Sequence, residues 1–260
     1  MGIVASEIIE RGIIVIESLP SGEPQTGKDL FDSLLRWRDN KQNHYRVYYH
    51  SVKSANDFRL VISQITGQIK EGSVYTLHLE THGCEDGIGF TNGDLLPWRN
   101  FCEIIRPLNV KMYGLLLVVL AMCTGAGVIC GVDLSNRAPF KAFIGATRTV
   151  SVGQIIEGFN AFYETYFDLL DISSSFKALQ DNSIDTDLGC SPFWILTDFG
   201  LFDKLTDFDR DPVAQKKWII DASKHDNIDT IEAEKRLRVY LDGLKQNKGY
   251  FCFKDLYGNE

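Results

Sequence analysis

The sequence predicts an α/β fold, a three-layer sandwich in which helices cover both faces of a mostly parallel central sheet. Short β-branched or apolar runs alternate with amphipathic helical stretches over the first 170 residues, as in chains built from β-α-β units. Residues 115–122 contain no polar side chain, which is typical of a strand covered on both faces. Strands that alternate with helices are joined by right-handed crossovers, so the strands are expected to lie parallel.

The elements follow from local composition and periodicity. Each strand is a β-branched or apolar run that ends at turn-forming residues, and each helix has apolar residues spaced three or four apart. A glycine-rich segment with an Asn-Gly turn is expected to form a small hairpin at 86–94. Strands are predicted at 12–17, 45–50, 75–83, 114–123 and 141–146, and helices at 26–38, 55–70, 96–106, 152–170 and 229–246.

The character of the chain changes near residue 170, where a polar stretch begins. We therefore expect a catalytic core at 1–170 and a C-terminal α-rich extension at 171–260. The extension should pack on the core and offer a regulatory or docking surface. Residues 171–189 are expected to form an exposed loop or short helix, and 249–254 a terminal edge strand.

Composition excludes several classes of function. The chain has 27 basic and 35 acidic residues, a net charge of −8, which disfavours nucleic acid as a partner. Six scattered cysteines without a Cys-x-x-Cys pair predict a reduced, cytoplasmic protein and no zinc site. No apolar run is long enough for a transmembrane helix, and no cofactor is expected. Met1-Gly2 with Ser6 fits the N-myristoylation pattern, which leaves acylation of Gly2 open.

Two predicted strands end in reactive side chains. Residues 75–83 end in His82-Gly83, and the apolar run 114–125 stops at Cys123-Thr-Gly125. Ligands of parallel sheets collect beyond the carboxyl ends of the strands. A buried cysteine or a satisfied histidine is the commoner explanation for either residue alone. The pair at two strand ends, each followed by small residues, favours one shared site.

His82-Gly83, together with Ala121-Met122-Cys123-Thr124-Gly125, resembles the caspase-like cysteine peptidases, including the metacaspase and CHAT branches. The resemblance covers about residues 13–170. It implies a caspase-like fold, a protein substrate and a cysteine endopeptidase (hydrolase) activity, with a role as a cell-death or defence effector. The chain departs from the caspase pattern at Ala121, where caspases carry glutamine.

The chemistry assigns a role to each residue of the site. Cys123 would act as thiolate nucleophile and His82 as the base that takes its proton and later protonates the leaving amine. The backbone N–H groups of Gly83 and Cys123 would form the oxyanion hole. Glu80 is a candidate to orient the imidazole, and a backbone carbonyl is the alternative.

Ala121 can neither hydrogen-bond a carboxylate nor pair with a cation, so this position cannot select substrates by charge. An acidic substrate pocket would draw on Asp86, Asp94 or Asp133, and a basic one on Arg137 or Arg148. The sequence does not choose between them, but strict cleavage after aspartate is not expected.

Two other classes of function remain open. A catalytically inactive caspase-like adaptor or interaction module would use the same fold for binding. A nucleotide-binding doubly wound domain is the least favoured of the three classes, because neither a Gly-x-Gly-x-x-Gly nor a Walker sequence is present. No pro-segment precedes Ile13, so control is expected through loops 125–139 or 171–189, or through a regulatory protein partner.

Overall fold

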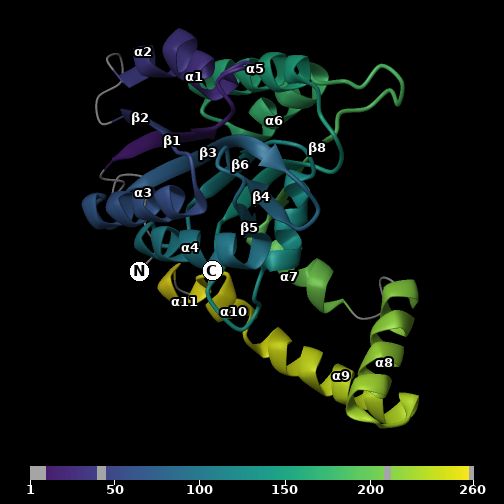
Figure 1. Ribbon diagram of the computed structural model, residues 1–260. Coiled ribbons are helices and arrows are strands. Elements are labelled where there is room, and N and C mark those ends of the chain that lie inside the picture. The colour runs from purple at the N-terminus through teal and green to yellow at the C-terminus, as the bar shows by residue number, and fades with distance from the viewer. Residues whose placement is uncertain (1–9, 40–44, 208–211, 258–260) are drawn as a thin grey trace.

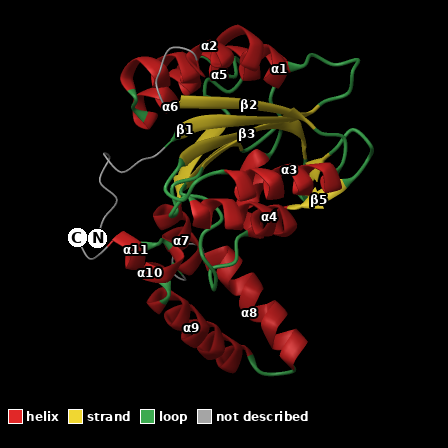
Figure 2. Ribbon diagram, turned by 90° about the vertical axis from the view of Figure 1, so that its left-hand side faces the viewer, coloured by secondary structure: helices red, strands yellow, loops and turns green. Residues whose placement is uncertain are grey.

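The computed structural model describes residues 10–39, 45–207 and 212–257. Gly2 and Ser6, on which the acylation pattern depends, lie outside this range. Helices cover both faces of a central sheet (Figures 1 and 2), so the predicted three-layer α/β fold is confirmed.

The central sheet has the strand order β2-β1-β3-β6-β7-β8. Neighbouring strands are parallel up to β7, and β8 pairs with β7 in the antiparallel sense. A small antiparallel hairpin of β4 and β5 continues from β3. The strands span β1 Arg11–Ser18, β2 Tyr45–Ser51, β3 Val74–Gly83, β4 Gly87–Gly89, β5 Leu95–Pro97, β6 Leu117–Ala121, β7 Ala142–Ala146 and β8 Phe193–Thr197.

Alternate residues of each strand enter two separate cores, because successive side chains of a strand point to opposite faces. On one face, Ile13, Val15 and Val119 pack under α1 (Thr26–Leu30), η2 (Phe31–Leu35), α2 (Arg36–Asp39), α5 (Val152–Leu169) and α6 (Ile172–Asp181). On the other, Ile14 and Leu120 pack under α3 (Ala55–Gln68), α4 (Trp98–Lys111) and α7 (Asp198–Thr206). The continuous apolar run of β6 is thus divided between two buried faces.

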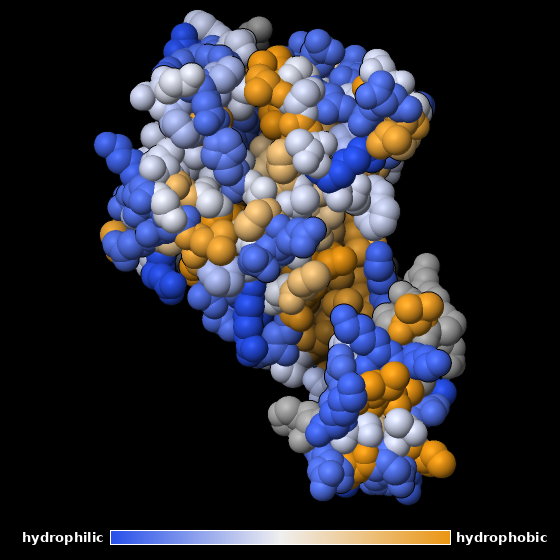
Figure 3. All heavy atoms as spheres, turned by 45° about the vertical axis from the view of Figure 1, so that its right-hand side comes forward, coloured by the Kyte–Doolittle hydropathy of each residue, from blue (hydrophilic) through white to orange (hydrophobic). Residues whose placement is uncertain are grey.

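The C-terminal part belongs only partly to an extension. β8 joins the central sheet and α6 packs on the core, although both follow residue 170. Helices α8 (Pro212–Asp226) and α9 (Thr230–Gln246) form a helical arm that projects from the core (Figure 1). The lower part of Figure 3, formed by this arm, carries apolar patches; Val213 and Ile231 there are each 80% exposed.

Two local predictions are wrong for physical reasons. Residues 249–254 form no strand but parts of the short helices α10 (Lys248–Phe251) and α11 (Lys254–Tyr257). Phe251, Cys252 and Phe253 are all buried, and three consecutive buried residues do not suit a strand with one solvent face. The helix expected to stop near Pro107 continues to Lys111 as α4. Burial of Leu108 offsets the hydrogen bond that the proline cannot make.

Candidate active site

His82 lies near the end of β3, where the strand leaves the central sheet and turns into the β4 hairpin. It pairs with Gly89 of β4, and its side chain is 62% exposed. Thr81, the residue before it, donates its hydroxyl hydrogen to the carbonyl oxygen of Ser18 at 3.2 Å. The backbone on both sides of the imidazole is therefore held by neighbouring strands.

Cys123 lies two residues beyond β6, in a tight turn. Thr124 has the left-handed backbone conformation (φ +51°), and its hydroxyl hydrogen-bonds the carbonyl oxygen of Cys123 at 2.8 Å. The backbone N–H of Val150 lies 3.4 Å from the sulfur of Cys123. The turn thus presents the thiol toward the loop that precedes α5.

The register of the two strands brings their carboxyl ends together. The pairing of β3 with β6 ends at Glu80 and Ala121, and His82 and Cys123 each follow two residues later on their own chain segment. Glu80 and Ala121, the last paired residues, are both buried, so the two segments leave the central sheet side by side. The prediction that the two strands are neighbours is confirmed, and the placement of His82 and Cys123 in one shared site stays a prediction.

Gly83 makes the close approach between these strand ends physically possible. A Cβ atom there would lie 2.2 Å from the carbonyl oxygen of Cys123 and 2.8 Å from Cγ of Met122. Only a residue without a side chain fits against the cysteine turn. The backbone of Gly83 therefore abuts that of Cys123.

We expect Gly83→Ala to separate the strand ends and to cost about 1–3 kcal/mol of unfolding free energy, the usual range for overpacking. Urea denaturation measures this cost. Gly243→Ala on α9 is the matched control, because nothing lies within 4 Å of a Cβ there, and helix propensity should leave it neutral or slightly stabilising. Equal midpoints for Gly83→Ala and the wild type would contradict the close approach.

A partner for the imidazole that the sequence analysis missed is Glu23. Its Oε2 lies 3.0 Å from Nε2 of His82, and its side chain is 43% exposed. A carboxylate only accepts hydrogen bonds, so Nε2 carries the proton and Nδ1 of the neutral ring is left as the acceptor. The signal in the sequence was an acidic residue in the loop directly after β1, the strand beside β3.

The loop that carries Glu23 is held at both ends. The backbone N–H of Glu23 donates to the carbonyl oxygen of Pro20 at 2.9 Å, and the side-chain amide of Gln25 donates to the same oxygen at 2.9 Å. On the far side of this loop, the N–H of Gly27 in α1 donates to the buried carboxylate of Glu17 in β1 at 2.8 Å. Glu17 thereby satisfies free donors at the start of α1.

His82 and Cys123 thus each have a partner from a different loop. The imidazole contacts Glu23 in the loop before α1, and the sulfur contacts Val150 in the loop before α5. Catalytic hydrogen bonds are often long in unliganded proteins and shorten when substrate binds.

Glu80 does not orient His82. It is 1% exposed, and its Oε1 lies 2.8 Å from Nε2 of His78; Thr26 donates its hydroxyl hydrogen to the other oxygen. Nδ1 of His78 lies 3.0 Å from the hydroxyl of Tyr163 on α5. The carboxylate belongs to a buried polar cluster beneath the site, because residue 80 lies two positions deeper in the same strand face.

The proposed acidic pocket residues are dispersed. Asp86 lies in the exposed turn after Gly83, where its carbonyl oxygen accepts the N–H of Trp98 at 3.2 Å. Asp94 accepts the N–H of Ala55 at 3.1 Å and so satisfies the start of α3. Of these two, only Asp86 follows directly on the His82-Gly83 segment.

Asp133 and Arg137 lie away from the cysteine turn. Hydrogen bonds from Ser135 hold the pKa of Asp133 below its usual value. Arg137 pairs with Asp255 and lines a groove of about 930 Å³ between α3, α4 and α11. The side-chain amide of Asn109 donates to the carbonyl oxygen of the neighbouring Ala138 at 2.8 Å. The side-chain oxygen of Asn109 accepts the N–H of Leu116, just before β6. Arg137 is therefore near the amino-terminal ends of the strands, whereas Cys123 follows the carboxyl end of β6.

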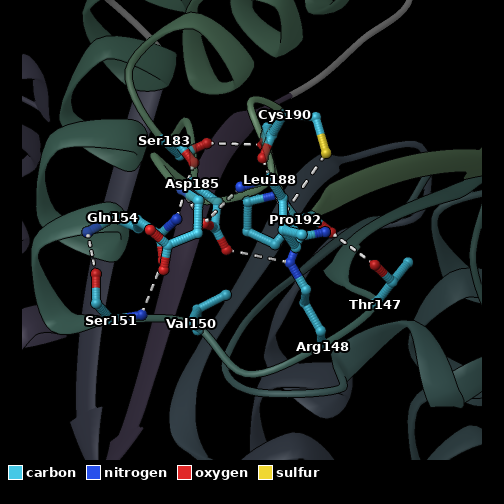
Figure 4. A network of polar contacts seen from close by, with 12 residues as sticks. Thr147, Arg148, Val150, Ser151, Gln154, Ser183, Asp185, Leu188, Cys190 and Pro192 are labelled. Carbon is cyan, nitrogen blue, oxygen red and sulfur yellow. Dashed lines mark hydrogen bonds and ion pairs between the residues drawn. The ribbon is translucent and has the colours of Figure 1, made fainter.

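Arg148 lies beside the cysteine turn. Its backbone carbonyl accepts the N–H of Thr124 at 3.2 Å. Its side chain, however, contacts Asp185 and Cys190 in the loop before β8 (Figure 4). The guanidinium is therefore already engaged by Asp185 and Cys190 and does not point to a substrate pocket.

The six cysteines differ in their surroundings. Cys102 and Cys252 are buried, and burial raises the pKa of each thiol to about 12. Cys84, Cys130 and Cys190 are exposed, and Cys123 is half-buried. Cys123 lies two residues beyond β6, and its sulfur accepts the N–H of Val150.

No group of three or more His, Cys, Asp or Glu side chains within residues 10–39, 45–207 and 212–257 is arranged to hold a metal ion. In the same part of the chain, no helix combines the length and apolar character needed to cross a bilayer.

Comparison with known proteins yields a structural likeness. Neither a protein-family model nor a curated protein sequence matches the chain. A secreted C11 cysteine protease from Bacteroides thetaiotaomicron, solved with an irreversible peptide inhibitor, matches with a TM-score of 0.54 at 9% sequence identity. The match covers 76% of this chain and 69% of that chain. At this identity, the likeness shows that the two chains share a fold.

Proposed function

We propose that the protein is a cysteine endopeptidase of the caspase-like type that cleaves a protein substrate through His82 and Cys123. The observation that supports it best is the pairing of β3 with β6 up to Glu80 and Ala121, together with the close approach of Gly83 to the carbonyl oxygen of Cys123. The fold shared with a cysteine protease adds independent support. A cell-death or defence role remains a proposal that rests on the resemblance of the sequence motifs alone, and a cytoplasmic location one that rests on the scattered cysteines.

In the proposed reaction, His82 takes the thiol proton and the Cys123 thiolate attacks the scissile carbonyl carbon. The C–N bond then breaks as the imidazolium protonates the leaving amine, and a water molecule hydrolyses the thioester with His82 as base. The N–H groups of Gly83 and Cys123 would stabilise the oxyanion. Their neighbouring backbones abut, which favours this assignment.

Glu23 would orient the imidazole. By accepting the Nε2 proton of His82 at 3.0 Å, it leaves Nδ1 free to take the proton of the thiol. The pair is largely exposed, so its stabilising energy is at most about 1 kcal/mol. Glu23 thus contributes orientation more than stability.

The substrate side chain that enters the site is not selected by Ala121, which is 2% exposed and carries no polar group. Asp86 remains the acidic candidate next to the histidine segment. We therefore propose a substrate preference other than strict aspartate.

A thiol-directed acyl probe followed by a peptide library tests the proposal. The wild type should be labelled at Cys123, as mass spectrometry of the modified peptide would show, and should cleave library members. Cys84→Ala, which removes an exposed neighbouring thiol, should leave both results unchanged. Absence of Cys123 labelling and of cleavage would reject the peptidase, and exclusive cleavage after aspartate would reject the substrate preference.

An adaptor without catalysis is the second candidate. It is favoured by the separate partners of His82 and Cys123 and by apolar side chains such as Val213 and Ile231 on the helical arm. Exposed apolar surface of this kind is common at protein-binding sites. The labelling experiment separates the two candidates, because an adaptor needs no reactive thiol.

A further inference from the structure

The loop between β7 and α5, residues 147–151, contacts the cysteine turn at two backbone positions. The carbonyl of Arg148 accepts the N–H of Thr124 at 3.2 Å, and the N–H of Val150 lies 3.4 Å from the sulfur of Cys123. Whatever fixes this loop therefore also fixes a hydrogen-bond donor at the sulfur.

The side chain of Arg148 extends from this loop to the loop before β8, residues 183–192 (Figure 4). Its Nε lies 3.5 Å from Oδ2 of Asp185, and both side chains are more than two-thirds buried. One terminal nitrogen donates to the carbonyl oxygen of Cys190 at 2.9 Å. The contact with Asp185 is an ion pair and not a hydrogen bond, since Nε of Arg148 has no hydrogen-bond partner within the described part of the chain.

Asp185 is itself held in place by its own loop. Its Oδ1 accepts the N–H of Asp187 at 3.0 Å and that of Leu188 at 3.3 Å. The backbone N–H of Asp185 bonds to the carbonyl oxygen of Cys190 at 3.1 Å. One carboxylate oxygen thus shapes the loop while the other is directed to Arg148.

Neutral hydrogen bonds to the loop before β8 come from the first turn of α5 and from the start of loop 147–151. Gln154 donates its side-chain amide to the carbonyl oxygen of Ser183 at 3.1 Å, and the N–H of Thr147 donates to that of Pro192 at 3.0 Å. These contacts hold the ends of the loops. The Arg148–Asp185 pair is the charged contact at the centre, next to Val150.

We propose that Arg148 is a positioning residue: its ion pair with Asp185 fixes loop 147–151 so that the Val150 N–H stabilises the thiolate of Cys123. The catalytic importance of this donor rests on the proposed function, whereas the donor contact itself does not. Hydrogen bonds to an ionised acceptor are about twice as strong as neutral ones. The thiol can also donate to the carbonyl oxygen of Val150, but that contact is longer, at 3.9 Å, so the nearer N–H favours the reactive thiolate over the thiol.

Alkylation of Cys123 by iodoacetamide, followed by mass spectrometry at a fixed neutral pH, tests the proposal without any substrate. Arg148→Ala should slow alkylation of Cys123 about tenfold, the size expected for loss of one hydrogen bond to a charged group. Alkylation of the exposed Cys84 and Cys130 in the same samples should not change, because neither belongs to the two loops.

Two further variants separate positioning from general destabilisation. Asp185→Asn keeps an oxygen for the N–H groups of its own loop but removes the charge, so it should slow Cys123 alkylation like Arg148→Ala. Arg148→Lys should restore part of the rate. Arg236→Ala removes an exposed ion pair on α9 and should leave alkylation at the wild-type rate.

Alkylation of Cys123 at or above the wild-type rate in Arg148→Ala or Asp185→Asn, with melting temperatures preserved, would overturn the proposal. A wild type that lacks peptidase activity while the variants still slow alkylation would reject the proposed function and leave the positioning role standing. If the wild type is active, Arg148→Ala should lower kcat with little change in KM, since the affected group is the nucleophile.

Discussion

Replacing either member of the dyad, Cys123→Ala or His82→Ala, is expected to abolish peptide turnover, with a loss of about 10⁴-fold or more. Alanine at 123 has no nucleophile, and alanine at 82 has no group that takes the thiol proton. Because Cys123 is half-buried and His82 is exposed, the melting temperature should stay within a few degrees. Initial rates on a cleaved library peptide and a thermal melt measure both quantities.

Glu23→Gln provides a graded comparison for this experiment. The amide keeps the shape of the side chain but removes the charge that faces the imidazole, so turnover should fall by a smaller factor than in His82→Ala. Cys84→Ala should retain the wild-type rate. Turnover in Cys123→Ala at more than a tenth of the wild-type rate would place the nucleophile elsewhere.

The buried cluster beneath the site predicts the largest loss of stability. Glu80→Ala should lower the unfolding free energy by about 3–5 kcal/mol, the usual cost of removing one partner of a buried pair. The substitution leaves Nε2 of His78 and the hydroxyl of Thr26 without their acceptor in the interior. Urea denaturation at neutral pH, with the slope checked against the wild type, measures the loss.

Two controls accompany this measurement. Glu80→Gln keeps an acceptor oxygen and should cost less than Glu80→Ala. Glu103→Ala removes a carboxylate that pairs with Arg99 on the surface of α4, and exposed pairs contribute at most about 1 kcal/mol. If Glu80→Ala costs no more than Glu103→Ala, the buried cluster does not stabilise the fold.

Much of the fold follows from local patterns. The apolar run before Cys123 and the run before His82 predicted two buried parallel strands, and β6 and β3 are neighbours in the sheet. Strand and helix periodicities are properties of nearby residues, so a single sequence carries them.

The surroundings of the site could not be predicted in this way. Glu23 and His82 are 59 residues apart along the chain, and no local pattern joins them. Arg148 was expected to select substrates, but its contact with Asp185 in another loop binds it within the protein. Arg137 was an equally good candidate by sequence. It packs on Tyr250 near the C-terminus, at the end of the strands opposite to Cys123.

The need for glycine at position 83 comes from its contact with Cys123 in the folded chain. The sequence by itself determined the α/β class and the strands that lead to His82 and Cys123. These depend on side-chain periodicity and on backbone conformations that adjacent residues impose. Only the tertiary structure decided that the imidazole meets Glu23, that Glu80 is buried with His78, and that Val150 faces the sulfur. Such contacts join loops from separate strands, so they exist only once the sheet has set the strand order and register.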